Sequence, residues 1–506
     1  MIGKFVVKDV CLIDMKISKF IKDLFTTGFT QILVFLLGVI LLKIMATALS
    51  KKYFGIFMVI RRIIGVGAPL ITLNLGVGLA RYVSYEREKE GLFLNASLWA
   101  VGILSLLVII TSIIFKGQLS LIFFNTSKYS LFIVLTAFFL FSYGTYTISY
   151  AFFRGRQEMN RANKMQVFYY LFPVIAALVL WQLFTGQYSK ILSFYFLFFS
   201  LWGIILGAIH IRQKVHFGWF SSIKKNTKSV KALFVYSLSR IPSSFFLALV
   251  FGIPVFVASH KISLVAAGYA GIAVAIIRLM EVFATPFNLL FLPKFAEIKR
   301  NNSDEEIKNK VSIVGNFVFT ALPLFAVVSY GLAKYVVVVL FGNKYIPAIQ
   351  SVSVVILFSA FYMSYVLIRG ILDGLFSFPY VNIICLAGVL TTAISSFLFN
   401  KNVLMLALDF GLGLFGMGVA AIYILIKRTN ISVQLNEILL SLIVTLLTFV
   451  LLLLLDRWMD FAVFNKYVKF GVEILYRAIL LLAVFLFYWK PKSLWAKELL
   501  CRIGKL

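Results

Sequence analysis

The chain has 506 residues, of which 61% are hydrophobic and 13% charged, and its mean hydropathy is +0.98, which excludes a water-soluble globular protein. The formal net charge is +30. The cations are spread over many short loops, so they do not indicate nucleic-acid binding.

Apolar runs of about 20 residues recur along the whole chain, and each is long enough to cross about 30 Å of hydrocarbon as a helix. They do not alternate apolar and polar residues, as the strands of a membrane barrel would. We therefore predict an all-α integral membrane protein with about fourteen transmembrane helices. In chain order the predicted spans are residues 23–46, 54–79, 92–115, 129–153, 165–184, 190–210, 233–258, 264–291, 311–333, 349–372, 378–399, 403–426, 438–455 and 470–489.

The loops on one side of these spans carry most of the Lys and Arg, including the basic run 212–231. Such loops face the cytoplasm, and an even number of spans then places both termini there. Residues 1–22 are basic but interrupted by Asp9 and Asp14, and they lack the compact apolar core of a cleaved signal peptide. We expect this segment to be cytoplasmic or to lie at the membrane interface.

The motif Ser-Tyr-x-x-x-Arg-Gly occurs twice, beginning at Ser149 and, 215 residues later, at Ser364. Further matches at nearly the same offset, such as Arg62 with Arg278, indicate a duplicated unit. We predict a six-helix bundle over 23–225 and its repeat over 226–430. Because six is even, the copies have the same orientation and should be related by an axis along the membrane normal.

Residues 431–506 lie outside the duplication and are expected to form two additional helices and a cytoplasmic tail. These helices would either pack on the second bundle or provide a surface for a lipid tail. The glycine run that begins at Gly411 and ends at Gly418 has the spacing of a dinucleotide fingerprint, but it lies within a span and follows no soluble strand. It therefore predicts close helix packing.

Ionised side chains are costly inside a membrane, at about 2.5–3.5 kcal/mol for a central cation, so they face a cavity, pair or reach the interface. Some of them have structural alternatives: Lys43, Arg240 and one of Arg61 and Arg62 could reach the interface. Arg278 and its neighbour three residues on could form a local ion pair. The candidate binding residues are Lys43, Arg61, Arg62, Arg240, Arg278 and Glu281.

Several segments, spread over residues 25–430, resemble the polysaccharide-exporter branch of the multidrug/oligosaccharidyl-lipid/polysaccharide exporter superfamily. Each segment alone is a weak indication, and the order and spacing of the segments are what make the resemblance specific. The segments are Lys52-Tyr53-Phe54-Gly55-x-Phe57, Leu75-Gly76-x-Gly78-Leu79-Ala80-Arg81-Tyr82-Val83, Gly268-Tyr269-Ala270 and Leu340-Phe341-Gly342-x-x-Tyr345-x-x-Ala348.

The resemblance implies two six-helix bundles that form a V-shaped central cavity, lined by the first, second, seventh and eighth spans, where the six candidate residues would bind substrate. It implies a flippase that moves a polyprenyl-pyrophosphate-linked oligosaccharide from the cytoplasmic to the outer leaflet by alternating access. Arg and Lys would neutralise the pyrophosphate. The product would serve surface polysaccharide assembly of the O-antigen, lipopolysaccharide or capsule type. Relatives carry an acid in the middle of the seventh span, where this chain reads Phe251-Gly252-Ile253-Pro254.

We expect a transporter and not an enzyme, with no catalytic residues, no cofactor and no metal, because Cys11, Cys385 and Cys501 have no metal-ligand or redox spacing. No nucleotide-binding motif is present, so an ion gradient or the membrane potential would supply energy. Expected partners are the lipid-linked oligosaccharide, membrane lipids and polysaccharide polymerase or assembly proteins. The protein should act as a monomer in the cytoplasmic (inner) membrane of a prokaryote.

Two alternatives stay open within the superfamily. A flippase for a lipid-linked peptidoglycan precursor would need the same chemistry. A multidrug/cation antiporter would need carboxylates in its cavity, whereas the candidate residues are mainly basic. A membrane glycan polymerase, which is an enzyme, usually needs a long outward loop, and no predicted outward loop exceeds about 20 residues.

Overall fold

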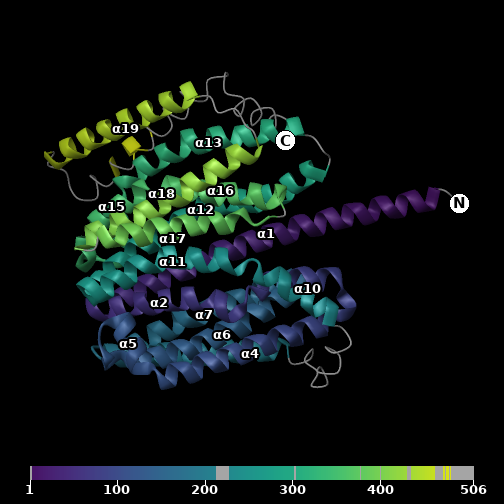
Figure 1. The fold of residues 1–506 in the computed structure, drawn as a ribbon, viewed down its shortest axis with the longest axis horizontal. Coiled ribbons are helices and arrows are strands. Elements are labelled where there is room, and N and C mark those ends of the chain that lie inside the picture. Colours follow the sequence, from purple (N-terminus) through teal and green to yellow (C-terminus); the bar gives the residue numbers. More distant parts are fainter. Residues whose placement is uncertain are drawn as a thin grey trace. The chain divides into compact units, whose positions relative to one another are not determined.

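The computed structural model describes residues 3–211, 227–300, 304–376, 378–398, 401–429 and 435–461, with single positions between 471 and 479. These residues form helices and no strand (Figure 1). Within these described ranges, eleven helices, or twelve if one bent pair counts as a single span, are long and apolar enough to cross a membrane. The all-α multi-pass membrane fold expected from the sequence is therefore confirmed.

The first twelve predicted spans coincide with helices or broken helices, and α19 (Leu435–Phe461) covers the thirteenth. The predicted span 470–489 lies largely outside the described residues, so the count of fourteen stays a prediction. Two short helices, α5 (Lys116–Phe124) and α14 (Ala333–Phe341), were expected as loops. The predicted segment 1–22 is helical from Gly3 and continuous with the first span.

The chain divides into two compact units, residues 1–245 (unit 1) and 246–506 (unit 2). The sequence-based boundary at 225/226 falls before α10 (Thr227–Leu238), and α10 packs against α3 and α4 of unit 1. This contact explains why unit 1 ends later in the chain than the predicted first bundle. Each unit is described by itself below.

Unit 1 is organised around α6, which packs against α2, α3, α4 and α8, while α1 packs along α7. Burial follows this arrangement, since α6 has buried residues along its whole length. The helices of unit 1 are α1 (Gly3–Ala48), α2 (Lys51–Thr72), α3 (Leu75–Tyr85), η1 (Arg87–Lys89), α4 (Glu90–Ile114), α5, η2 (Ser127–Tyr129), α6 (Ser130–Gly155), α7 (Met159–Leu183), α8 (Tyr188–Ile211), α10 and the start of α11 (Ile241–Val257).

The second predicted span, 54–79, is broken into α2 and α3. Ser50 caps the start of α2 by accepting a hydrogen bond from the backbone N–H of Tyr53. The break occurs where Leu73 and Asn74 adopt left-handed backbone conformations, with φ of 48° and 51°. Such values are uncommon for residues other than glycine, so surrounding contacts must hold this bend in place.

The glycine of the first Ser-Tyr-x-x-x-Arg-Gly motif permits close contact between α6 and α3. A Cβ added at Gly155 would lie 2.9 Å from the backbone oxygen of Ala80 and 2.8 Å from the Cβ of Val83. Helices in membranes approach this closely only where a small residue leaves room for the neighbouring backbone. The motif glycine therefore has a packing role in unit 1.

Unit 2 is built around α12, which packs along α16, and around α18, which packs against α15, α16 and α17 (Figure 1). The tenth predicted span is bent by 47° between α15 and α16. The helices that follow α11 are η3, a π-helical turn (Ala258–Ile262), α12 (Leu264–Arg300), α13 (Asp304–Tyr330), α14, η4 (Asn343–Ala348), α15 (Ile349–Leu357), α16 (Ser359–Leu375), α17 (Tyr380–Leu398), α18 (Val403–Thr429) and α19.

The glycine run of α18 faces its neighbours, as the sequence predicted. A Cβ at Gly418 would lie 2.7 Å from the backbone oxygen of Phe361 on α16, and one at Gly413 would lie 2.0 Å from Oγ1 of Thr392 on α17. The run therefore serves helix packing and is not a nucleotide-binding loop.

Candidate functional site

Unit 1 encloses a cavity of about 660 Å³, a size typical of small-molecule sites. Residues of α1, α2, α3, α6, α7, α8 and the start of α11 line it. Among the described lining residues there are two cations, Arg61 and Arg154, and no carboxylate. The formal charge of the described lining is therefore positive, which suits an anionic ligand.

Arg61 of α2 supplies the positive charge in the middle of the candidate site. Its guanidinium lies 5.7 Å from the ring centre of Phe57, and Tyr195 of α8 also lines this part of the cavity. The Nη1 atom of Arg61 is buried and has no hydrogen-bond partner in the described part of the chain. Since a guanidinium is always charged and offers five donors, this nitrogen is available for an anionic ligand.

Arg154 is the second cation of the cavity, and it is the arginine of the first duplicated motif. It is exposed and lies over the ring of Tyr150, 5.6 Å from its centre. The prediction of site residues did not include Arg154, because it was assigned to a loop. The motif itself was the sequence signal that could have identified it.

Tyrosine rings form one wall of the cavity. The rings of Tyr146 on α6 and Tyr169 on α7 are parallel, with centres 3.7 Å apart and an interplanar angle of 9°. Tyr150 also stacks on Tyr146, with a centre distance of 5.9 Å and an interplanar angle of 20°. The Tyr169 hydroxyl is buried and has no hydrogen-bond partner among the described residues.

An amide group completes this wall. Gln166 of α7 accepts hydrogen bonds at Oε1 from the Tyr150 hydroxyl at 3.2 Å and from Gln31 Nε2 of α1 at 3.1 Å. Gln166 in turn donates to Gln31 Oε1 at 3.4 Å. These bonds hold α1, α6 and α7 together and fix the orientation of the Gln166 amide beside the cavity.

Asn74 connects the break between α2 and α3 to the start of α11. Its side-chain amide donates to the backbone oxygen of Arg240 at 2.7 Å and to Oγ of Ser244 at 2.9 Å. Both Asn74 and Ser244 line the cavity. These two hydrogen bonds stabilise the left-handed conformation at Asn74 and so determine the shape of this end of the cavity.

Of the residues predicted in the first unit, Arg61 lines the cavity and the others do not. Lys43 is exposed on α1, and Arg62 is half-buried next to Arg61. The Arg240 guanidinium lies over the ring of Tyr236 at 3.9 Å and donates to its backbone oxygen at 3.3 Å, so only the Arg240 carbonyl takes part in the site.

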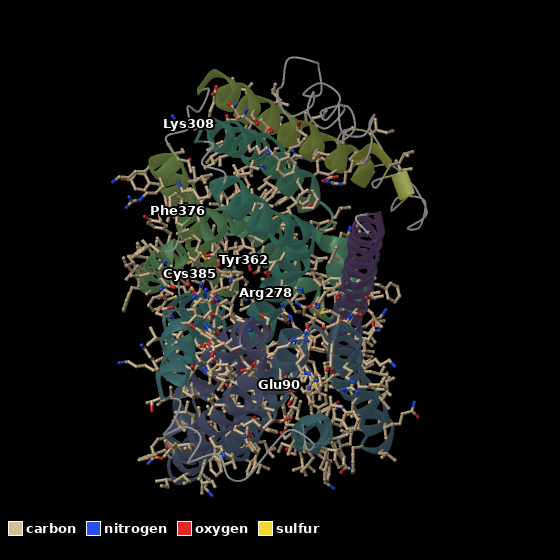
Figure 2. The ribbon with its side chains drawn as sticks, turned by 90° about the vertical axis from the view of Figure 1, so that its right-hand side faces the viewer. Glu90, Arg278, Lys308, Tyr362, Phe376 and Cys385 are labelled. Atoms are coloured by element: carbon tan, nitrogen blue, oxygen red, sulfur yellow. The ribbon has the colours of Figure 1, made fainter. Side chains whose placement is uncertain are left out.

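In unit 2, Arg278 and Glu281 form the local ion pair that their spacing allowed, at 2.8 Å. The hydroxyl of Tyr362 donates to Glu281 at 2.9 Å and accepts from Arg278 at 3.2 Å. Figure 2 shows Arg278 and Tyr362 next to each other, on α12 and α16. The Arg278 guanidinium also lies 4.0 Å from the ring centre of Phe251. Its charge is thus balanced within unit 2, although the side chain stays partly exposed.

One buried acid was missed by the sequence reasoning. Asp409 of α18 is fully buried and accepts a hydrogen bond from the Ser395 hydroxyl of α17. No periodic pattern marks it, because its neighbours on both sides are apolar.

A second, smaller cavity of about 230 Å³ lies at the ends of unit 2 helices. Lys299, Lys308 and Arg428 line it together with Phe376, and Lys308 and Phe376 are labelled in Figure 2. Long cationic side chains at helix ends commonly reach the membrane interface, and these residues occupy such positions.

The family comparison agrees with the sequence resemblance. Residues 20–299, more than half of the chain, match the family model described as polysaccharide biosynthesis protein. No curated protein sequence matches the chain.

Two solved structures share the fold. The lipid II flippase MurJ in its inward closed conformation has a TM-score of 0.69 and 15% sequence identity, covering 93% of this chain and 99% of that one. An inward-facing multidrug resistance transporter of the MATE family, in the MOP superfamily, has a TM-score of 0.61 and 12% identity, covering 79% and 94%. Both are named as transport proteins, and at these identities the likeness shows the shared fold.

Proposed function

This chain belongs to the polysaccharide biosynthesis protein family, and we propose that it is a flippase for a polyprenyl-pyrophosphate-linked oligosaccharide. It carries this lipid from the cytoplasmic to the outer leaflet by alternating access, and the glycan then enters a surface polysaccharide of the O-antigen or capsule type.

The observation that supports this most is Arg61, whose Nη1 donor is unpaired at a cavity whose described lining contains no carboxylate. A pyrophosphate carries negative oxygens that accept the paired donors of a guanidinium. Arg154 offers a second cation at the same cavity. An antiporter for cations would need the opposite charge there, so the unit 1 cavity argues against that alternative.

A peptidoglycan-precursor flippase is the second candidate, and the fold similarity to the lipid II flippase favours it. Its substrate would also be lipid-linked and anionic, so Arg61 would have the same role. The two candidates differ only in the glycan.

In this proposal the protein acts as a monomer in the cytoplasmic (inner) membrane of a prokaryote, with both termini cytoplasmic. Polysaccharide polymerase or assembly proteins take up its product. An ion gradient or the membrane potential supplies the energy, since the sequence has no nucleotide-binding motif.

The test compares two adjacent arginines in a strain from which the gene has been deleted. Lipid-linked glycans are extracted and assigned to a leaflet after complementation with wild type, Arg61→Gln or Arg62→Gln. We expect the deletion strain and Arg61→Gln to accumulate lipid-linked glycan on the cytoplasmic side, with transport by Arg61→Gln reduced at least about thirtyfold. Arg62→Gln, whose side chain does not line the cavity, should restore surface glycan.

Normal surface glycan in the deletion strain, together with new sensitivity to cationic drugs, would overturn the proposal and favour the antiporter. Accumulation of a peptidoglycan precursor in place of a surface-polysaccharide unit would select the second candidate.

A further inference from the structure

The buried hydroxyl of Tyr169 needs a partner that unit 1 does not supply. Tyr169 is 1% exposed, lines the cavity and has an unpaired hydroxyl within the described residues. Its ring stacks on Tyr146 at 3.7 Å and also contacts Phe199, with centres 5.0 Å apart. Because these rings restrict its movement, the hydroxyl is presented in a fixed position, and a ligand in the cavity can satisfy it.

Gln166 offers further hydrogen-bonding groups beside Tyr169. One amide hydrogen of Gln166 is used by Gln31, and Gln166 Oε1 is held by Tyr150 and Gln31. An amide has two hydrogens, so Gln166 retains one donor in an orientation fixed by its neighbours. A fixed planar amide and a phenol hydroxyl are suited to the hydroxyl or acetamido groups of a sugar, which both donate and accept hydrogen bonds.

A row of aromatic rings connects this polar pair to Arg61. Phe57, which lies under the Arg61 guanidinium, contacts Tyr195 with a centre distance of 6.1 Å. Tyr195 contacts Phe199 at 5.9 Å, and Phe199 contacts Tyr169 at 5.0 Å. The cation and the hydroxyl thus lie along one row of contacting aromatic rings within unit 1, so a ligand that carries a phosphate and a sugar can contact both.

The duplication within the chain provides an internal comparison. Aligning the two Ser-Tyr-x-x-x-Arg-Gly motifs pairs Tyr143 with Phe358 and Tyr146 with Phe361. In unit 2 these phenylalanines pack directly against the glycines of α18. The duplicated segment therefore packs without hydroxyls at these two positions, so the hydroxyls of Tyr143 and Tyr146 are not required for packing of the fold.

We infer that α6 and α7 form a sugar-binding subsite in unit 1, in which Tyr169 and Gln166 bind the sugar attached directly to the pyrophosphate. Arg61 binds the phosphate, and the tyrosine wall contacts the apolar face of the sugar ring. The inference rests on the proposed function and adds to it the residues that recognise the glycan. Tyr150 and Gln31 are positioning residues, because they act by orienting Gln166.

The experiment measures binding to the purified full-length protein with two probes. One is the lipid-linked oligosaccharide that accumulates in the deletion strain, and the other is polyprenyl pyrophosphate without sugar. We expect wild type to prefer the sugar-bearing lipid. Tyr169→Phe and Gln166→Leu should each reduce that preference about three- to tenfold, the effect of one neutral hydrogen bond, and leave binding of the bare pyrophosphate unchanged.

Two further variants separate this inference from the function on which it rests. Arg61→Gln should weaken both probes by the same factor, because both carry the pyrophosphate. Tyr53→Phe removes a hydroxyl from a unit 1 tyrosine whose ring packs against Tyr129 and Tyr188 outside the cavity lining, and it should change neither affinity.

Equal affinity of wild type for both probes would overturn the subsite and leave the flippase intact. If Tyr169→Phe reduced the affinity for both probes equally, the subsite would also be overturned, because the hydroxyl would then support the structure of the cavity and not bind the sugar. Absence of binding to either probe, or of any accumulated lipid-linked glycan, would reject the proposed function itself.

Discussion

Arg278 forms an ion pair of 2.8 Å with Glu281, one turn further along α12, and Tyr362 hydrogen-bonds to both. This arrangement distinguishes two kinds of intramembrane arginine in one chain. Arg278 has its charge balanced within unit 2, whereas Arg61 has an unpaired donor at a cavity. The ion pair of Arg278 stabilises unit 2, whereas the unpaired donor of Arg61 is available for a ligand.

The first prediction is that substitution of these two arginines affects different properties. Arg278→Gln leaves Glu281 without its cation, so we expect the free energy of unfolding to fall by about 1 kcal/mol, a modest value because both side chains are partly exposed. Arg61→Gln should keep stability and lose transport. Thermal unfolding and glycan export, measured on both variants, check this. A stable but inactive Arg278→Gln would show that Arg278 binds substrate.

The second prediction concerns the bend at Asn74. Asn74→Ala removes two hydrogen bonds, worth about 1 kcal/mol each, and places alanine at a φ of 51°. Asn74→Gly also loses the hydrogen bonds but accepts the left-handed backbone freely. We therefore expect the midpoint of thermal unfolding to decrease in the order Asn, Gly, Ala. If the Asn74→Ala variant were more stable than Asn74→Gly, the left-handed backbone at position 74 would not be strained for a residue with a Cβ atom.

The third prediction concerns the glycine of the first motif. Gly155→Ala forces α6 away from the backbone of α3, and we expect a loss of about 1–3 kcal/mol in stability. Gly102→Ala on α4 is the matched control, since a Cβ there would have nothing within 4 Å. Thermal unfolding of the two purified variants measures the difference. Equal stability would mean that α6 and α3 separate without cost.

The fourth prediction concerns the segment after the duplication. Arg477 is 2% exposed, pairs with Asp456 at 2.7 Å to Oδ2 and donates to the Val328 backbone oxygen of α13 at 3.3 Å. Asp456→Leu leaves the buried Arg477 charge unbalanced and should cost about 3–5 kcal/mol, whereas Arg477→Met leaves a carboxylate that is 30% exposed and should cost less.

The double variant Arg477→Met with Asp456→Leu should recover much of that loss, because no unbalanced charge remains. Thermal unfolding of the single and double variants measures both effects. A double variant as unstable as the sum of the single ones would show that the charges do not interact. The side chains of Leu324, Val328 and Leu452 form a buried apolar cluster beside this pair. It gives α19 a packing role on α13, one of the two roles expected for the additional helices.

Sequence reasoning identified the membrane helices because their cause is local. An apolar run of about 20 residues forms a helix in hydrocarbon whatever its neighbours are, since its backbone groups have no other partner there. The same holds for the glycine run of α18, whose spacing places small residues on two helix faces, one against Phe358 and Phe361 and the other against α17. The sequence also showed the duplication and selected Arg61 as one of several costly cations.

Tertiary structure decided what those residues do. Arg61 and Arg62 are adjacent and chemically identical, and only the packing of α2 among its neighbours determines that Arg61 lines the cavity. Tyr169, Gln166 and Asn74 carry no pattern of their own, and the partners described above lie between 16 and 170 residues away in the chain. A local sequence pattern shows which side chains cost free energy when they are buried. Which of them find a partner depends on segments that meet only when the chain has folded.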